Sequence, residues 1–75
     1  MHGHQMMQLT VNQQAFVIEA KATVAALLTA WSGQSDEQLK VAVALNQRVL
    51  TRKEWSTQQL EPKDELLIFN LVAGG

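Results

Sequence analysis

Apolar and polar residues alternate along residues 7–12, and the neighbouring stretch, residues 15–20, fits the same period except that Val17 on its outward face is also apolar. A period of two puts apolar side chains on one face of a strand and polar side chains on the other, which is typical of half-buried strands. Between the two stretches, Asn12 tolerates the positive φ that a tight hairpin turn requires. We therefore predict a β-hairpin in which Phe16 and Ile18 of the return strand point inward.

The apolar period then changes from two to that of an amphipathic helix. Four large apolar residues fall at positions i, i+3, i+4 and i+7: Val24, Leu27, Leu28 and Trp31. Thr23 precedes them as an N-cap whose hydroxyl can accept a free backbone N–H, and Ser32 and Gly33 end the helix, with Gly33 as the C-cap. A helix of about two turns is marginal alone, so we predict that this stripe packs on a sheet rather than forming a ligand groove.

A third pattern has no polar alternation and covers residues 41–45, which read Val-Ala-Val-Ala-Leu. Strands that are covered on both faces have sequences of this kind. Residues 46–48 turn the chain into a brief strand over residues 49–50. The second half of the chain is therefore predicted to add at least two strands to the sheet.

Polar segments with single apolar residues connect the predicted elements. Residues 34–39 are predicted to form a loop. Thr51 is placed to cap a short helical turn, from which Trp55 should plug the edge of the core. Leu60 is the apolar anchor of the segment that leads to a turn at residues 62–64.

The last apolar run, residues 67–72, is short, β-branched and aromatic, which predicts a strand. If Leu66 and Ile68 face the helix, the alternate side chains must face away from it. These outward residues are Leu67, Phe69 and Leu71. A contiguous exposed apolar row on a small protein usually marks a partner site, so we predict a partner-binding patch here unless a loop covers the row.

Ala73, Gly74 and Gly75 follow this strand, and a glycine has no side chain to pack within it. Glycine also tolerates any φ and has no Cβ to clash with a narrow channel. Three extended residues reach about 10 Å, at roughly 3.3–3.6 Å per residue, which would carry a terminal carboxylate into another protein's active site. We predict a flexible tail over these residues with the Gly75 carboxylate as its functional group; an ordinary frayed terminus is the alternative.

A chain of 75 residues, 47% of them hydrophobic, is expected to form one domain with little room for a deep substrate cavity. Its net charge of −1 argues against nucleic-acid binding. The absence of cysteine excludes disulfides and Cys-based zinc sites, and no apolar run approaches the roughly 20 residues of a membrane span. We expect a cytoplasmic protein that binds neither nucleic acid nor membrane and is a monomer when alone.

Both histidines, His2 and His4, lie in an aperiodic leader that we expect to be disordered and either native or added for expression. Two ligands are too few for a zinc site, and the scattered acidic residues offer no catalytic pair. We therefore predict no metal site and no catalytic residue. The predicted organisation is a leader over 1–6, an α+β domain over 7–72 with a mixed sheet of four to five strands packed on one main helix, and the tail over 73–75.

This pattern resembles the ubiquitin-like β-grasp sulfur carriers, and most closely the ThiS family of thiamine biosynthesis. The residues that carry the resemblance are Met7-Gln8-Leu9, Asn12, Thr23-Val24, Leu27-Leu28, Ala44-Leu45-Asn46-Gln47, Arg52, Trp55, and Phe69 through Ala73-Gly74-Gly75. The resemblance covers the chain from about residue 7 to its end. The family often has glycine where Lys21 and Lys63 stand and proline where Thr51 stands, which bears on local turn geometry more than on function.

The resemblance implies a carrier protein and not an enzyme. A ThiF-type adenylating enzyme would use ATP and magnesium to convert the Gly75 carboxylate into an acyl-adenylate, because a carboxylate is a poor electrophile until its oxygen belongs to a leaving group. A persulfide donor would then supply sulfur and leave a terminal thiocarboxylate. Thiazole synthase would use this sulfur to build the thiazole ring of thiamine, and the carrier itself would bind no cofactor.

Two other functions stay open at this point. A paralogous carrier, such as the small subunit of molybdopterin synthase, also ends in Gly-Gly, although such chains tend to be longer and often have prolines where this chain has Phe69-Asn70-Leu71-Val72. A β-grasp binding or protein-tagging module would instead leave Gly75 in an isopeptide bond to a target lysine. The mass of the product separates a tag from a sulfur carrier.

Overall fold

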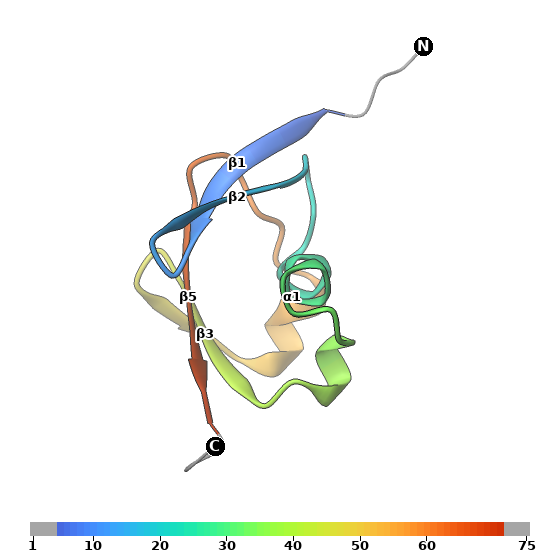
Figure 1. Cartoon of the computed structure of the whole chain (residues 1–75). Coiled ribbons are helices and arrows are strands. Elements are labelled where there is room, and N and C mark those ends of the chain that lie inside the picture. The colour runs from blue at the N-terminus through green and yellow to red at the C-terminus, as the bar shows by residue number, and fades with distance from the viewer. Residues whose placement is uncertain (1–4, 72–75) are drawn as a thin grey trace.

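The computed structural model describes residues 5–71, which form a five-stranded mixed sheet that curls around one main helix (Figure 1). In chain order the elements are β1 (Met6–Val11), β2 (Gln14–Glu19), α1 (Val24–Ser32), the 3₁₀ turn η1 (Asp36–Gln38), β3 (Val41–Leu45), β4 (Arg48–Leu50), the 3₁₀ turn η2 (Arg52–Ser56) and β5 (Glu65–Asn70). The strand order in the sheet is β2-β1-β5-β3-β4. The predicted α+β architecture, a mixed sheet on one helix, is confirmed.

Both hairpins of the sheet turn on an Asn-Gln pair. Asn12 and Gln13 have φ values of 51° and 71°, and Asn46 and Gln47 have values of 50° and 73°. Two successive residues with positive φ are characteristic of the type I′ turn, whose twist matches that of the flanking strands. The predicted turn at Asn12 is confirmed, and its geometry is repeated at Asn46.

The helix begins and ends where its capping residues predict. The Thr23 Oγ1 accepts a hydrogen bond from the Ala26 backbone N at 3.2 Å. At the other end Gly33 adopts φ 78° and its N–H donates to the Thr29 carbonyl at 2.8 Å. This left-handed C-cap is the conformation that glycine adopts at least cost.

The predicted helical stripe packs into the core for three of its four members. Val24, Leu27 and Leu28 are fully buried, whereas Trp31 is 40% exposed. Trp31 stands in the last turn of α1, just before the segment that contains η1. The prediction that Trp31 belongs to the core is wrong in this respect.

The core is a single cluster between the sheet and the helix. Its members come from every strand and from the connecting segments: Met7, Leu9, Val11, Ile18, Val24, Leu27, Leu28, Leu39, Val41, Val43, Leu45, Leu50, Trp55, Leu60, Leu66 and Ile68. Trp55 and Leu60 are buried as predicted. Leu39 is also buried, although the polar segment around it predicts a loop, and that segment contains η1.

Strand β3 is almost wholly buried, as its apolar sequence predicts. On its outer face Ala44 is covered by side chains of the neighbouring strands and not by a second layer of structure. Ala44 lies opposite Val49 on one side and Leu67 on the other. These two larger side chains flank the methyl group and shield it from solvent. The continuous apolar sequence of this strand therefore does not require a second layer of structure.

The first strand begins at Met6, which pairs with Glu19. This is one residue earlier than the predicted boundary between the leader and the domain. Residues 1–4 lie outside the described part of the chain, as does the predicted tail over residues 73–75. Among residues 5–71, no helix has the length and apolar character needed to cross a membrane.

Candidate functional site

The strand that leads to the C-terminal residues lies in the middle of the sheet (Figure 1). Strand β5 runs parallel to β1 and antiparallel to β3. Its pairing with β3 extends from Leu66, opposite Leu45, to Asn70, opposite Val41. The Leu71 N–H continues this side by donating to the Lys40 carbonyl at 2.9 Å. The chain is thus held in an extended path up to Leu71.

The side chains of β5 alternate between core and surface as the sequence predicts. Leu66 and Ile68 are buried against the helix side, and Leu67 is half-buried. Phe69 is 54% exposed and Leu71 is 65% exposed. The outward orientation of Leu67, Phe69 and Leu71 is therefore confirmed, while their role in partner binding stays a prediction.

The exposed apolar surface extends beyond β5. Ala42 lies opposite Phe69 and Ala44 opposite Leu67, so small side chains continue the same face across β3. Val49 of β4 lies opposite Ala44 and is 72% exposed. We call this surface the outer patch. Its exposed and half-buried residues are Leu67, Phe69, Leu71, Ala42 and Val49, and the buried Ala44 lies between Leu67 and Val49. Sequence reasoning missed the part on β3 and β4, because it follows from the neighbours of β5 in the sheet.

The predicted sulfur-carrying residue and the rest of the tail lie outside the described residues. These are Gly75, Gly74 and Ala73. The described chain ends at Leu71, four residues before Gly75. One residue, Val72, therefore separates the outer patch from the predicted tail in the sequence.

Two turn asparagines hold β5 through their side chains. The Asn46 Oδ1 accepts from the Glu65 N–H at 2.9 Å, at the start of the strand. The Asn12 Oδ1 accepts from the Ile68 N–H at 2.8 Å, further along it. The sequence identified Asn12 as a turn residue, but its side-chain partner is 56 residues away and no local pattern points to it.

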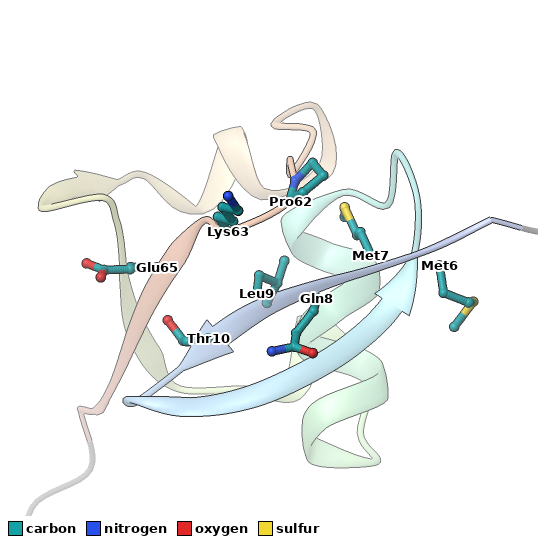
Figure 2. Close-up of a pocket in the computed structure, with 8 residues that line it drawn as sticks. All are labelled: Met6, Met7, Gln8, Leu9, Thr10, Pro62, Lys63 and Glu65. Atoms are coloured by element: carbon teal, nitrogen blue, oxygen red, sulfur yellow. The ribbon is translucent and has the colours of Figure 1, made fainter.

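One hollow of the described surface lies beside β1. It is an open groove lined by residues of β1 and of the segment before β5: Met6, Met7, Gln8, Leu9, Thr10, Pro62, Lys63 and Glu65. Figure 2 shows that Met7 and Leu9 lie on the opposite side of β1 from Met6 and Gln8, as the alternation along a strand requires. Lys63 and Glu65 are its only ionisable residues, and they form no nucleophile–base pair.

Glu54 has a structural role at the start of η2. Glu54 accepts a hydrogen bond from the Thr51 backbone N at 2.7 Å and one from the Arg48 guanidinium at 3.2 Å. The Thr51 amide, with a smaller contribution from Arg48, holds the pKa of the Glu54 carboxyl below its ordinary value. The first contact belongs to the capping box of η2, and the second is an ion pair between η2 and β4. Within residues 5–71 no three His, Cys, Asp or Glu side chains cluster to hold a metal ion.

A mixed sheet curled around one helix, with the last strand at its centre, defines a β-grasp protein, and an apolar patch lies on the outer face of this sheet. The model of the ThiS family matches residues 4–75. The chain belongs to the ThiS family, and it is a sulfur carrier of thiamine biosynthesis, not an enzyme. Carriers of this family bind no cofactor of their own, as the sequence predicts.

Two individual relatives agree with this assignment. The chain is 36% identical over 70 residues to the sulfur carrier protein ThiS of Escherichia coli (strain K12), a match that covers 92% of this chain and all of that protein. It is 28% identical to the crystal structure of the thiamine biosynthesis protein ThiS from Geobacter metallireducens. The two structures superpose with a TM-score of 0.75, and the match covers 92% of this chain and all of that chain. These matches favour the thiamine carrier over the paralogous carrier and the tagging module.

Proposed function

We propose that the Gly75 carboxylate is the group that carries the sulfur. The carboxylate attacks the α-phosphorus of ATP on an adenylating enzyme, pyrophosphate leaves, and an acyl-adenylate forms. The terminal sulfur of a persulfide then attacks the activated carbonyl and expels AMP. A thiol cleaves the resulting S–S bond and leaves a thiocarboxylate on Gly75. The proposal takes Gly75 as the last residue of the chain.

The observation that carries this proposal is the course of β5. A strand at the centre of the sheet holds the chain up to Leu71, which leaves four residues to Gly75. Four extended residues span about 13–14 Å, at roughly 3.3–3.6 Å per residue. That length suffices to bring the carboxylate to a buried ATP while the body of the carrier stays on the partner's surface.

The partners that this chemistry requires are a ThiF-type adenylating enzyme, which binds ATP and magnesium, a persulfide sulfur donor, and a thiazole synthase that takes the sulfur. We propose that the adenylating enzyme and the synthase dock on the outer patch. The patch is apolar, it is exposed at Phe69 and Leu71, and it adjoins the tail. A cytoplasmic location, where ATP and reducing thiols are available, fits the same chemistry.

The role of Gly75 is tested by ATP–pyrophosphate exchange with the adenylating enzyme. The unaltered carrier should support exchange, whereas a variant that lacks Gly75 or one extended by a single alanine should not. Melting temperatures of both variants should stay within about 2 °C of the unaltered carrier, because the altered residue follows the last strand. Exchange at the normal rate with either variant would contradict the proposal.

The docking role of the outer patch is tested by Phe69→Asp, with Val17→Asp as the matched control. Both residues are exposed apolar residues of the sheet, at 54% and 55%, but Val17 lies on β2, two strands away from β5. Phe69→Asp should raise the KM for the carrier about tenfold or more, which is the loss typical of a central interface aromatic. Val17→Asp should change it less than about twofold. Equal effects of the two substitutions would rule out the outer patch as the docking surface.

A further inference from the structure

Strand β5 is supported unequally on its two sides. On the β3 side, pairing continues to Asn70, and the Leu71 N–H still donates to the Lys40 carbonyl. On the β1 side, residue pairing covers only Glu65 and Leu66. The part of β5 after Leu66, which carries Leu67 and Phe69 of the outer patch and leads to the tail, therefore lies beyond the end of β1.

The side chain of Asn12 occupies the place where the next bond of the β1–β5 ladder would fall. In a parallel ladder a residue donates its N–H to the carbonyl of one residue on the partner strand. Its own carbonyl then accepts from the N–H of the residue that lies two positions later on that partner strand. The Asn12 N–H donates to the Leu66 carbonyl at 2.9 Å. The Ile68 N–H should then meet the backbone carbonyl of Asn12, but it meets the Asn12 Oδ1 at 2.8 Å.

The hairpin turn explains why the side-chain oxygen of Asn12 replaces its backbone carbonyl as the acceptor. Asn12 adopts φ 51°, so its backbone has already left the direction of β1. Its side-chain amide provides a carbonyl oxygen in place of the one that the turn removes. Ile68 N–H lies in a partly buried position, where an unpaired amide is costly, so this bond fixes β5 one step beyond the end of β1.

We propose that Asn12 is a positioning residue for sulfur carriage. It holds the second half of β5 on the path along which Phe69 and Leu71 meet the adenylating enzyme and the tail enters its ATP site. The inference rests on the proposed function of Gly75. If the segment leaves this path for part of the time, the apparent affinity for the partner falls by the fraction of carrier that remains competent.

Few residue types can fill this position. It requires a residue that tolerates a left-handed backbone and carries a carbonyl oxygen one carbon from Cβ, which limits the choice to asparagine and aspartate. Glycine accepts the backbone conformation but supplies no acceptor. Asn12→Gly therefore removes the side-chain bond without straining the turn, and Asn12→Asp should restore it.

Asn46 provides a matched control within the same chain. It has nearly the same φ, 50°, and its Oδ1 also accepts a β5 amide, that of Glu65 at 2.9 Å. That bond lies at the start of β5, away from the exit of the strand. Asn46→Gly removes this bond, together with the bond that the Asn46 Nδ2 donates to the Asp64 Oδ1 at 3.0 Å, at a place where neither loss should affect the tail.

The first measurement is amide hydrogen exchange at Leu71 in the carrier alone. Asn12→Gly should accelerate exchange at Leu71 roughly two- to tenfold, the range expected when one hydrogen bond that supports a strand end is lost. Asn12→Asp and Asn46→Gly should leave it within about twofold of the unaltered carrier. A purely local role for Asn12 would change exchange at Ile68 and leave Leu71 unaffected.

The second measurement is the KM and kcat for the carrier in ATP–pyrophosphate exchange. Asn12→Gly should raise KM about three- to tenfold while kcat stays within about twofold, because the acid group is unchanged and only the competent fraction falls. Asn12→Asp should recover most of the loss, and Asn46→Gly should behave like the unaltered carrier.

The outcomes separate this inference from the function on which it rests. If the unaltered carrier supports ATP–pyrophosphate exchange and Asn12→Gly has the same KM as Asn46→Gly, the positioning role of Asn12 is refuted and the role of Gly75 stands. If the unaltered carrier supports no exchange with its adenylating partner, the role of Gly75 fails. Amide hydrogen exchange at Leu71 then still decides whether Asn12 holds the end of β5.

Discussion

The two lysines at positions where the ThiS family often has glycine make a direct test of the turn geometry. Lys63 has φ 72° and Lys21 has φ 70°, and both side chains are exposed. A left-handed backbone costs a residue with a Cβ roughly 1–2 kcal/mol. Glycine avoids that cost but loses about 0.5–1 kcal/mol through its greater freedom in the unfolded chain. The net expectation for Lys63→Gly or Lys21→Gly lies between about 0 and 1.5 kcal/mol of added stability, with a midpoint of about 0.75 kcal/mol.

The backbone contacts at Lys63 do not oppose this gain. The Lys63 N–H donates to the Gln8 carbonyl at 2.8 Å, a bond that glycine keeps. Lys53 supplies the control, because it is an exposed lysine within η2, where φ is negative. Lys53→Gly removes the same charge and the same side chain but should cost about 0.5–1 kcal/mol.

Thermal and urea unfolding of the three variants measure these differences. In a domain of this size 1 kcal/mol corresponds to roughly 4–8 °C in melting temperature, so Lys63→Gly and Lys21→Gly should each melt about 2–8 °C higher. Lys53→Gly should melt lower by a similar amount. A loss of stability in all three variants would show that the positive φ at Lys21 and Lys63 carries no strain, and the reasoning would be refuted.

Three further predictions concern stability. Thr23→Ala should cost about 1 kcal/mol in urea unfolding, because it removes the N-cap of α1; an unchanged midpoint would contradict the capping role. Leu27→Ala should cost about 2–5 kcal/mol, whereas Trp31→Ala should cost clearly less because its indole is partly in solvent; the opposite order would contradict the packing of the helix. The pKa of Glu54 is lowered mainly by the Thr51 amide, so its stabilisation is complete above the ordinary carboxyl value of 4.5 and is lost as the pH falls through the lowered pKa. Glu54→Gln should therefore destabilise the protein at about pH 7 and not at about pH 2, and a difference independent of pH would exclude this linkage.

The sequence predicts the elements of this fold well where one physical rule decides them. Alternation identifies β1 and β2, and a capping threonine and a glycine bound α1. The alternation along β5 also predicts which side chains face outward, since neighbouring side chains of a strand must point to opposite faces.

The order of the strands is beyond the reach of these local rules. Nothing in residues 65–70 states that β5 lies between β1 and β3, because that placement depends on pairing between segments far apart in the chain. For the same reason Val49 could not be assigned to the outer patch, and the Asn12 side chain could not be paired with Ile68. The exposure of Trp31 was also missed, since periodicity gives the direction of a side chain but not how much of it the rest of the fold covers.

The conformations of the turn lysines show a further limit. Lysine is an uncommon residue at positive φ, so its presence at positions 21 and 63 gives no local signal for a left-handed turn. The resemblance to a family that often has glycine there was the available indication. The structure agrees with that indication at both positions.

The intact mass of the carrier tests the central claim most directly. The protein is incubated with its adenylating enzyme, ATP, magnesium and a persulfide donor, and its mass is taken before and after. If Gly75 carries the sulfur, the mass should rise by the difference between one sulfur atom and one oxygen atom, and the change should map to the C-terminal peptide. A mass that stays unchanged while the adenylating enzyme is active, or a change that maps elsewhere in the chain, would contradict the account.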